Sequence, residues 1–299
     1  MLHTIAFAGW RLLWLVPYRL LFFLLYAIGW RWLLRPYDPH GRASFAYLYW
    51  VTTVREAIDR LLPVASVGGG VAGVRLLLWR GIGAAPASSS IVAEILLTVA
   101  ALYTFTALGL LLLFGLTGAG AQYHRVLLVF LFGLPVPVAL ALLLRYGSLF
   151  NRLERFFAPL VGRSDLAEGA NALDHELRAT LSRGWTLLGA GVLQLAALIS
   201  ASFEVWYALR LCGHPVGAGS ALILESMTQA MRHVAFFVPA GVGVQEAGLV
   251  LFGQALGISG ELALTVSMAK RIREVLCGLP PLGSWWWMEA RRLSASSRA

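Results

Sequence analysis

The sequence predicts an all-α, polytopic integral membrane protein built from two inverted repeats, each with a re-entrant hairpin of broken helices. Three observations support this fold class. Apolar runs recur along the 299 residues, of which 59% are hydrophobic and 13% are charged, against about 25% charge in a soluble domain. Two further apolar stretches are interrupted by proline and glycine. The distribution of arginine places these two interruptions on opposite sides of a membrane.

The net charge of +9 comes almost entirely from arginine. These arginines flank or interrupt apolar segments and form no soluble basic patch, so we expect no nucleic-acid partner. They are typical of topology signals and of contacts with anionic lipid. Cys212 and Cys277 lack metal-ligand spacing, and we expect no metal site and no cofactor.

Five apolar runs have the length of a membrane-spanning helix. They are residues 10–34, 91–116, 126–144, 185–211 and 263–287. Arg19 lies inside the first run; we expect its side chain to extend to the membrane interface, and an interior partner is the alternative.

The first hairpin is predicted over residues 45–80, with a break at Pro63, Gly68 and Gly69. Its second half is too short to cross a bilayer alone, so we expect the hairpin to begin and end on one side. A connector at 81–90 leads to the next span.

The second hairpin is predicted over residues 220–256, with a break at Pro239, Gly241 and Gly243. Proline removes a backbone donor, and glycine weakens a helix further. In hydrocarbon, backbone that leaves the helix needs partners in protein or in a water-filled cavity. The break therefore predicts a cavity lined by Arg232, Gln245 and Glu246. The alternative is a proline-kinked span without a site.

Residues 146–184 form a long polar stretch in which charges alternate with leucines, as in an amphipathic surface helix. We interpret it as a cytoplasmic linker between a first repeat, 1–145, and a second repeat, 185–299. With the linker and the basic C-terminal tail in the cytoplasm, the first hairpin opens inside and the second outside. Discontinuous helices would then meet near the midplane of a bacterial inner membrane and form a substrate site.

The last span carries Lys270, Arg271, Arg273 and Glu274, roughly 20 Å from its interfacial tryptophans at about 1.5 Å per residue. A charge at this depth costs about 2.5–3.5 kcal/mol, so these side chains need partners. Lys270 and Glu274 are one helical turn apart and can pair. For the two arginines, Glu246 is the first candidate partner, Glu225 and Glu204 are others, and a lipid phosphate is the alternative.

Three segments, 54–69, 236–248 and 270–276, resemble motifs of the flippase-like family, also called the lysylphosphatidylglycerol synthase transmembrane-domain family. Within it, the chain is most similar to the hopanoid-biosynthesis-associated branch. The resemblance implies movement of a hopanoid, phospholipid or polyprenyl-linked lipid between leaflets or toward the outer membrane. Two departures are Gly70, where family members often carry an acidic residue, and the family's usual first span, which we expect to be missing before Trp10.

We expect a binding site for a membrane lipid with an anionic head group or a hopanoid, and no catalytic residues. The predicted substrate-binding residues are Arg55, Arg232, Gln245, Glu246, Lys270, Arg271, Arg273 and Glu274. Three alternatives remain: a salt-bridge network that only supports folding, a membrane transferase acting on a hopanoid or polyprenyl lipid with Glu246 as general base, and a scaffold for lipid-biosynthesis proteins.

Overall fold

The computed structural model describes residues 9–62, 68–117, 128, 133, 135–147, 165–235, 238 and 241–296, and the secondary structure in them is helical. The predicted all-α class is therefore confirmed. The elements are η1 (Gly9–Trp14), α2 (Leu15–Leu34), η2 (Arg35–Tyr37), α3 (Phe45–Leu61), α4 (Gly68–Leu78), α5 (Ala84–Thr117), α7 (Pro135–Tyr146), α9 (Asp165–Leu181), α10 (Gly184–Leu211), α11 (Ala218–Val234), α12 (Val244–Ala255) and α13 (Gly260–Ser296).

Two of the described helices, Ala84–Leu116 and Gly184–Leu211, are long and apolar enough to cross a membrane, and α4 is a shorter apolar helix. Both long helices coincide with predicted spans. The first part of the predicted span 126–144 lies mostly outside the described residues, and α7 forms its second part from Pro135 onward.

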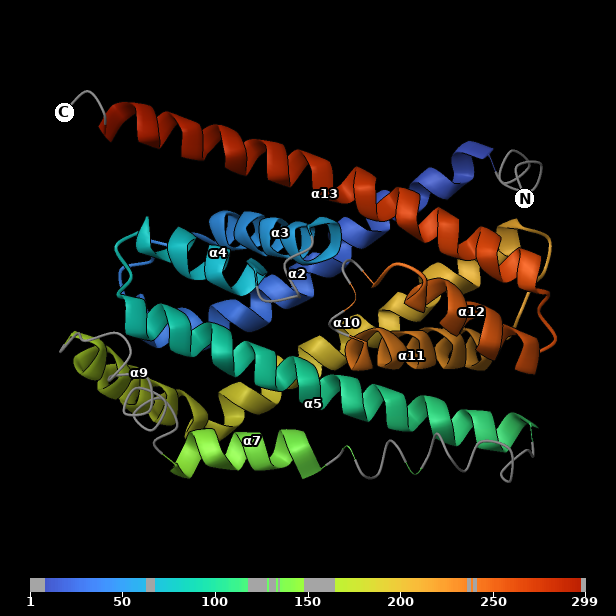
Figure 1. Ribbon diagram of the computed structural model, residues 1–299, viewed down its shortest axis with the longest axis horizontal. Helices are drawn as coiled ribbons and strands as arrows, with labels where there is room; N and C mark the ends of the chain where they lie inside the picture. Colours follow the sequence, from blue (N-terminus) through green and yellow to red (C-terminus); the bar gives the residue numbers. More distant parts are fainter. Residues whose placement is uncertain are drawn as a thin grey trace.

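The long helices α5 and α13 run along opposite sides of the molecule, and two pairs of shorter helices lie between them (Figure 1). The pair α3 and α4 occupies one half of the view, and the pair α11 and α12 occupies the other. The C-terminal ends of α3 and α11 both point toward the middle of the molecule (Figure 1). The two pairs therefore approach the centre from opposite ends.

The packing of the two pairs follows the same scheme. Within each pair the two helices contact each other, α3 with α4 and α11 with α12. Each pair also contacts the long helix that follows it, and its first helix packs on the long helix of the other half: α3 on α13, and α11 on α5. The helices that precede the pairs, α2 and α10, pack on each other. This reciprocity supports the predicted repeat; its orientation in a membrane stays a prediction.

The predicted breaks differ in detail from the observed ones. Pro63 and Pro239 lie outside the described residues. Gly68 and Gly69 were expected in the first break but form the first turn of α4, where the Gly69 N–H donates to Asp59 Oδ1 at 2.9 Å. The first N–H groups of a helix have no partner within the helix, and this bond supplies one of them with an acceptor. Helix α4 can therefore begin at Gly68, before the end of the predicted break.

At the second break, Gly241 and Gly243 have φ angles of 59° and 82°, a left-handed conformation that only glycine adopts without strain. Gly243 is the N-cap of α12, and its N–H donates to Glu246 Oε2 at 2.8 Å. Both glycines thus lie in the predicted break between α11, which ends at Val234, and α12, which Gly243 begins.

The predicted connector at 81–90 is shorter than expected, because α5 already begins at Ala84. Pro86 lies in the first turn of α5, where a helix has no hydrogen bond to lose at the proline nitrogen. The amphipathic helix predicted in the linker is α9, and its Leu177 is fully buried against Leu33 and Ala93. The polar stretch is thus attached to the helical bundle through an apolar contact.

Candidate functional site

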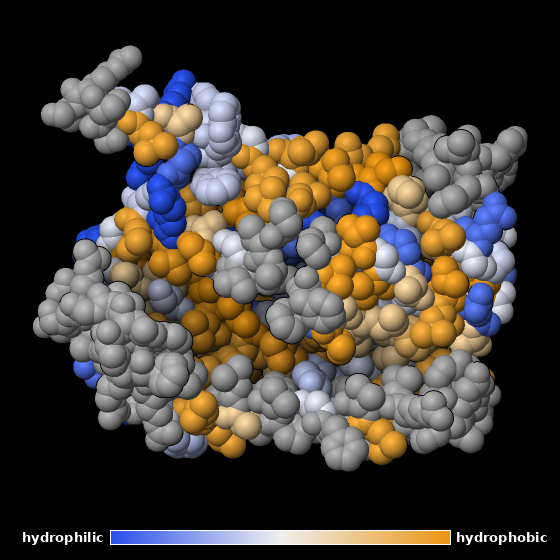
Figure 2. Space-filling view, in the orientation of Figure 1, coloured by the Kyte–Doolittle hydropathy of each residue, from blue (hydrophilic) through white to orange (hydrophobic). Residues whose placement is uncertain are grey.

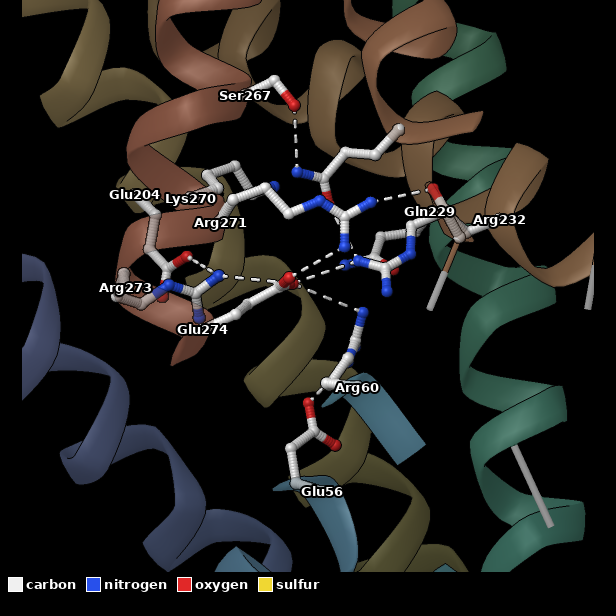
Figure 3. A network of polar contacts seen from close by, with 12 residues as sticks. Glu56, Arg60, Glu204, Gln229, Arg232, Ser267, Lys270, Arg271, Arg273 and Glu274 are labelled. Atoms are coloured by element: carbon white, nitrogen blue, oxygen red, sulfur yellow. Dashed lines mark hydrogen bonds and ion pairs between the residues drawn. The ribbon is translucent and has the colours of Figure 1, made fainter. Parts of the chain in front are cut away.

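Nine charged side chains from six helices form one connected set of ion pairs, which we name the central charge cluster. Its members are Arg19, Glu56, Arg60, Glu204, Arg232, Glu246, Arg271, Arg273 and Glu274. The cluster lies where the inner ends of α3 and α11 meet α13, and several of its arginines converge on Glu274 (Figure 3).

Glu274 is the centre of the cluster. Its carboxylate lies 3.2 Å from Arg232, 3.3 Å from Arg271, and 3.8 Å from both Arg60 and Arg273. Arg60 comes from the end of α3 and Arg232 from the end of α11. A single carboxylate on α13 therefore connects the two helix pairs.

A second layer of pairs surrounds this centre. Arg273 lies 3.3 Å from Glu204 on α10, and Arg60 donates to Glu56 at 2.9 Å. Arg19 on α2 donates to Glu56 at 2.9 Å and lies 3.9 Å from Glu204. Arg19 is only 7% exposed, so the expectation that it extends to the interface was wrong. It stays inside because the carboxylates of Glu56 and Glu204 and the rings of Phe22 and Phe23 surround it.

One partly exposed edge of the cluster is formed by Arg271 and Glu246, whose side chains are 19% and 29% exposed; Arg60 and Glu56, at 19% and 30%, form another. They lie 3.3 Å apart, and Arg271 also donates to the Gly241 carbonyl at 2.9 Å. Ser267 donates to Glu246 and accepts from Gln245, and Gln245 in turn accepts from Arg232 at 2.8 Å. The structure thus brings together the predicted residues of the second break and of α13.

Lys270 is paired differently from the prediction. Its Nζ lies 2.5 Å from Glu225 on α11, and both side chains are at most 3% exposed. The expected pair with Glu274 does not form, because the arginines already surround that carboxylate and Glu225 faces Lys270 from the adjacent helix. Gln229 donates to the other oxygen of Glu225 at 2.8 Å.

Arg55 is also separate from the cluster. Its guanidinium donates to Glu94 on α5 at 2.6 Å and lies 4.7 Å from the centre of the Trp30 ring. Of the eight predicted binding residues, Arg55 and Lys270 are therefore held in one-to-one pairs. Sequence reasoning did not assign Arg19, Glu56 and Arg60 to the site, although charged side chains within apolar runs were a signal that could have included them.

A small cavity of ≈ 20 Å³ lies beside the cluster, lined among others by Arg19, Glu56, Arg60, Arg273 and Glu274. This is room for about one water molecule. The side-chain Nε atoms of Arg19 and Arg273 are buried without a hydrogen-bond partner in the described structure, so a water there would have donors to meet. At the place where a cavity is predicted, hydrogen bonds join Arg232, Gln245, Ser267 and Glu246 in a chain.

The outer surface beside the cluster is largely apolar. Figure 2 shows a broad hydrophobic area over the middle of the molecule, with a hydrophilic patch visible within it, below α13 and near the start of α12. Next to the cluster's edge in sequence, Val242 is 64% exposed, Ile272 46% and Met268 45%. Arg271 and Glu246 therefore reach a surface that is otherwise suited to lipid.

No three His, Cys, Asp or Glu side chains gather to hold a metal ion in the part of the chain that the structure describes. What the cluster offers chemically is a set of guanidinium donors with exchangeable carboxylate partners. Arginine binds phosphate and carboxylate through paired donors in the same geometry.

Helices of membrane-spanning length, an apolar outer surface and an internal ion-pair network together define an integral membrane protein of the helical class. The chain matches the family model described as the lysylphosphatidylglycerol synthase TM region over residues 4–279, and it belongs to this family. Membership places it among membrane domains with a lipid-related function. No curated protein and no solved structure matches the chain.

Proposed function

We propose that this protein is a membrane lipid transporter, moving an amphiphilic lipid between leaflets or toward the outer membrane. The lipid class is a hopanoid, a phospholipid or a polyprenyl-linked lipid. The apolar part of the lipid stays in the bilayer, and the head group passes the central charge cluster. The proposed location is a bacterial inner membrane with the C-terminus in the cytoplasm.

The observation that carries this proposal is the arrangement of charge around Glu274. The cluster contains five arginines and four glutamates, and four of the arginines share the Glu274 carboxylate. An anionic head group would balance the excess positive charge and would offer the arginines the oxygens that they now share. A network with a purely structural role has no need for this excess.

The edge of the cluster supports a path for the head group. Arg271 and Glu246 are one of the cluster's two partly exposed pairs, and they lie where α13 passes the start of α12; the other pair is Arg60 with Glu56. A head group that arrives there replaces Glu246 as the partner of Arg271. Arg232 and Arg273 lie behind Arg271 around the same Glu274, so the anion can pass from one guanidinium to the next.

The small cavity supports a closed conformation as the one described, because ≈ 20 Å³ holds no phospholipid head group. Passage requires the inner ends of α3 and α11 to part from α13. The ion pairs of Glu274 with Arg60 and Arg232 are among the contacts that join these three helices, and they would break and re-form in each cycle.

One feature favours a second candidate, a transferase that modifies such a lipid. Glu246 is a partly exposed carboxylate of the cluster, and Ser267 donates to it at 3.1 Å, so it could act as a general base. A scaffold for lipid-biosynthesis proteins is the third reading, and it would not depend on the cluster's charges.

The test uses purified protein in vesicles that carry, in separate experiments, fluorescent phosphatidylglycerol, a short polyprenyl phosphate or an aminohopanoid. We expect at least one lipid to change leaflet with unchanged mass, and Arg271→Gln to slow this at least about tenfold, the loss of one charge-assisted bond. The control is Arg75→Gln, which removes an equal charge from the exposed pair of Arg75 with Glu289. A lipid of altered mass would establish the transferase; undiminished movement in the inserted Arg271→Gln variant would refute the proposed role of the cluster.

A further inference from the structure

A second, much larger cavity lies at the corner where α2, η2 and α3 meet, and it is separate from the central charge cluster. Its volume is ≈ 990 Å³, and its lining includes Arg31, Trp32, Arg35, Phe45 and Leu48. Arg31 follows the cluster residue Arg19 by twelve positions in α2, which is roughly 18 Å along a helix at 1.5 Å per residue. The cavity is thus at the end of α2, outside the proposed transport path.

The cationic part of this cavity consists of Arg31 of α2 and Arg35, the first residue of η2, which are four positions apart and both line the cavity. Both are exposed, and neither forms an ion pair with any residue that the structure describes. Asp38 also lines the cavity, but its two carboxylate oxygens accept the backbone N–H groups of Arg42 and Ala43, each at 2.8 Å. The carboxylate is therefore engaged in closing the loop.

The other wall of the cavity is apolar. Trp32 is 43% exposed, and the half-buried Ile28 and Phe45 contribute further apolar surface. The guanidinium of Arg31 lies 5.8 Å from the centre of the Phe45 ring. Two cations that lack a carboxylate partner among the described residues, beside accessible apolar side chains, match a ligand with an anionic head and an apolar tail.

The corner is also held in place before any ligand arrives. Tyr37 Oη lies 2.6 Å from Thr180 Oγ1 and donates to the Glu176 carbonyl at 3.0 Å, which fixes η2 to α9. Ser44 caps α3 by accepting from the Tyr47 N–H at 3.3 Å. A preorganised site loses less conformational entropy on binding than a mobile one.

We infer that this cavity binds an anionic phospholipid of the surrounding leaflet, with Arg31 and Arg35 on the phosphodiester and an acyl chain along Trp32. Free phosphate has the same head-group chemistry but gains nothing from the apolar wall. The bound lipid is a fixed partner of the α2–α3 corner and is distinct from any lipid that moves past Glu274.

The test is native mass spectrometry of the detergent-purified full chain with phosphatidylglycerol, phosphatidylcholine or inorganic phosphate added. We expect retention of one phosphatidylglycerol, weaker binding of phosphatidylcholine, and no retained phosphate. The double variant Arg31→Gln with Arg35→Gln should lower phosphatidylglycerol affinity by on the order of tenfold or more, about threefold to fivefold per arginine. Arg42→Gln is the matched control, because this exposed arginine is on the same loop but does not line the cavity.

Three results would overturn the inference: equal retention of phosphatidylcholine, displacement of the lipid by millimolar phosphate, or an equal loss of binding in Arg42→Gln. The thermal transition of each variant is measured alongside, so a loss of binding counts only in folded protein. Arg271→Gln should keep this lipid even if it stops transport, so failure at the corner and failure at the cluster are distinguishable.

Discussion

The two helix pairs hold their arginines in matching places but in different electrostatic settings. Arg55 of α3 pairs with Glu94 of α5 at 2.6 Å, and Arg232 of α11 pairs with Glu274 of α13 at 3.2 Å. In each half an arginine of the first short helix thus meets a glutamate of the long helix that follows. In the described structure Glu94 has one arginine partner, whereas Glu274 has four.

The N-terminal caps of α4 and α12, the second helix of each pair, also differ in how many partners they share. In the first pair, Asp59 of α3 caps α4 by accepting from Gly69, so the cap fastens the two helices together. In the second pair, Glu246 caps its own helix by accepting from Gly243, and its other oxygen is shared with Arg271 and Ser267. The Arg55–Glu94 pair and the Asp59 cap each join one partner in the described structure, whereas the corresponding contacts of the second pair are shared and can exchange. Similar folds in the two halves therefore support unequal roles.

The largest difference in stability between the two halves is expected on replacing Glu274 and, separately, Glu94. Glu274→Gln leaves four arginines without their shared carboxylate, and breaking a buried pair already costs about 3–5 kcal/mol. We expect it to lower the thermal transition more than Glu94→Gln and to abolish lipid movement. Chemical or thermal unfolding in detergent, with lipid movement in vesicles, measures both. Equal effects of the two variants would remove the distinction between the halves.

The Lys270–Glu225 pair provides the second test, because it is a one-to-one pair within the second half. Lys270→Met or Glu225→Leu alone should destabilise the protein by about 3–5 kcal/mol, since each leaves a buried charge unpaired. The double variant should recover most of this stability and should retain transport. A double-mutant cycle on the free energy of unfolding checks the recovery, and loss of transport in the stable double variant would place this pair in the path.

Substitutions at two adjacent glycines test whether the close contact between α3 and α4 stabilises the first pair. A Cβ added at Gly69 would lie 2.6 Å from the Arg55 carbonyl oxygen and would clash with the Asp59 carboxylate. Because backbone cannot yield easily, Gly69→Ala should cost about 1–3 kcal/mol. Gly70→Ala is the control: its Cβ meets only Ile91 at 3.6 Å, so the better helix propensity of alanine should leave stability unchanged or slightly raised. Similar unfolding midpoints for both variants would show that the close contact between α3 and α4 does not stabilise the first pair.

The smallest change in stability is expected at the edge of the cluster. Glu246→Gln removes the partly exposed partner of Arg271, and such pairs contribute at most about 1 kcal/mol. Lipid movement should change nonetheless, because Arg271 would lose the carboxylate that a head group has to replace. The measurement compares unfolding midpoints with transport rates; a large loss of stability with normal transport would show that the edge is structural.

The all-α class, the positions of the long apolar helices and the broken segment at Gly241 and Gly243 were predictable, because hydrophobic length and glycine conformation are local properties of the chain. The need for ion pairs around α13 was predictable for the same reason, since charges in an apolar run must find partners. Glu246 and Glu204 were correctly named as candidate partners of its arginines.

The choice among possible partners depends on tertiary packing, which spacing does not encode. Lys270 and Glu274 are correctly spaced for a helical pair, but α11 brings Glu225 to Lys270 and α3 brings Arg60 to Glu274. Arg19 was expected at the interface because the carboxylates that hold it are on α3 and α10, far from it in sequence. The cavity at the α2–α3 corner was not predicted either, because the way these helices meet creates it.

The reciprocal packing of α3 on α13 and of α11 on α5 has a consequence for biogenesis. During synthesis, α3 emerges from the ribosome long before the helix that covers it, so Arg60 and Glu56 wait in the nascent chain without the Glu274 side of their network. The first half would need protection by the membrane-insertion machinery until α13 is inserted. Chains that stall before α13 would present Arg60 without its Glu274 partner to membrane quality control.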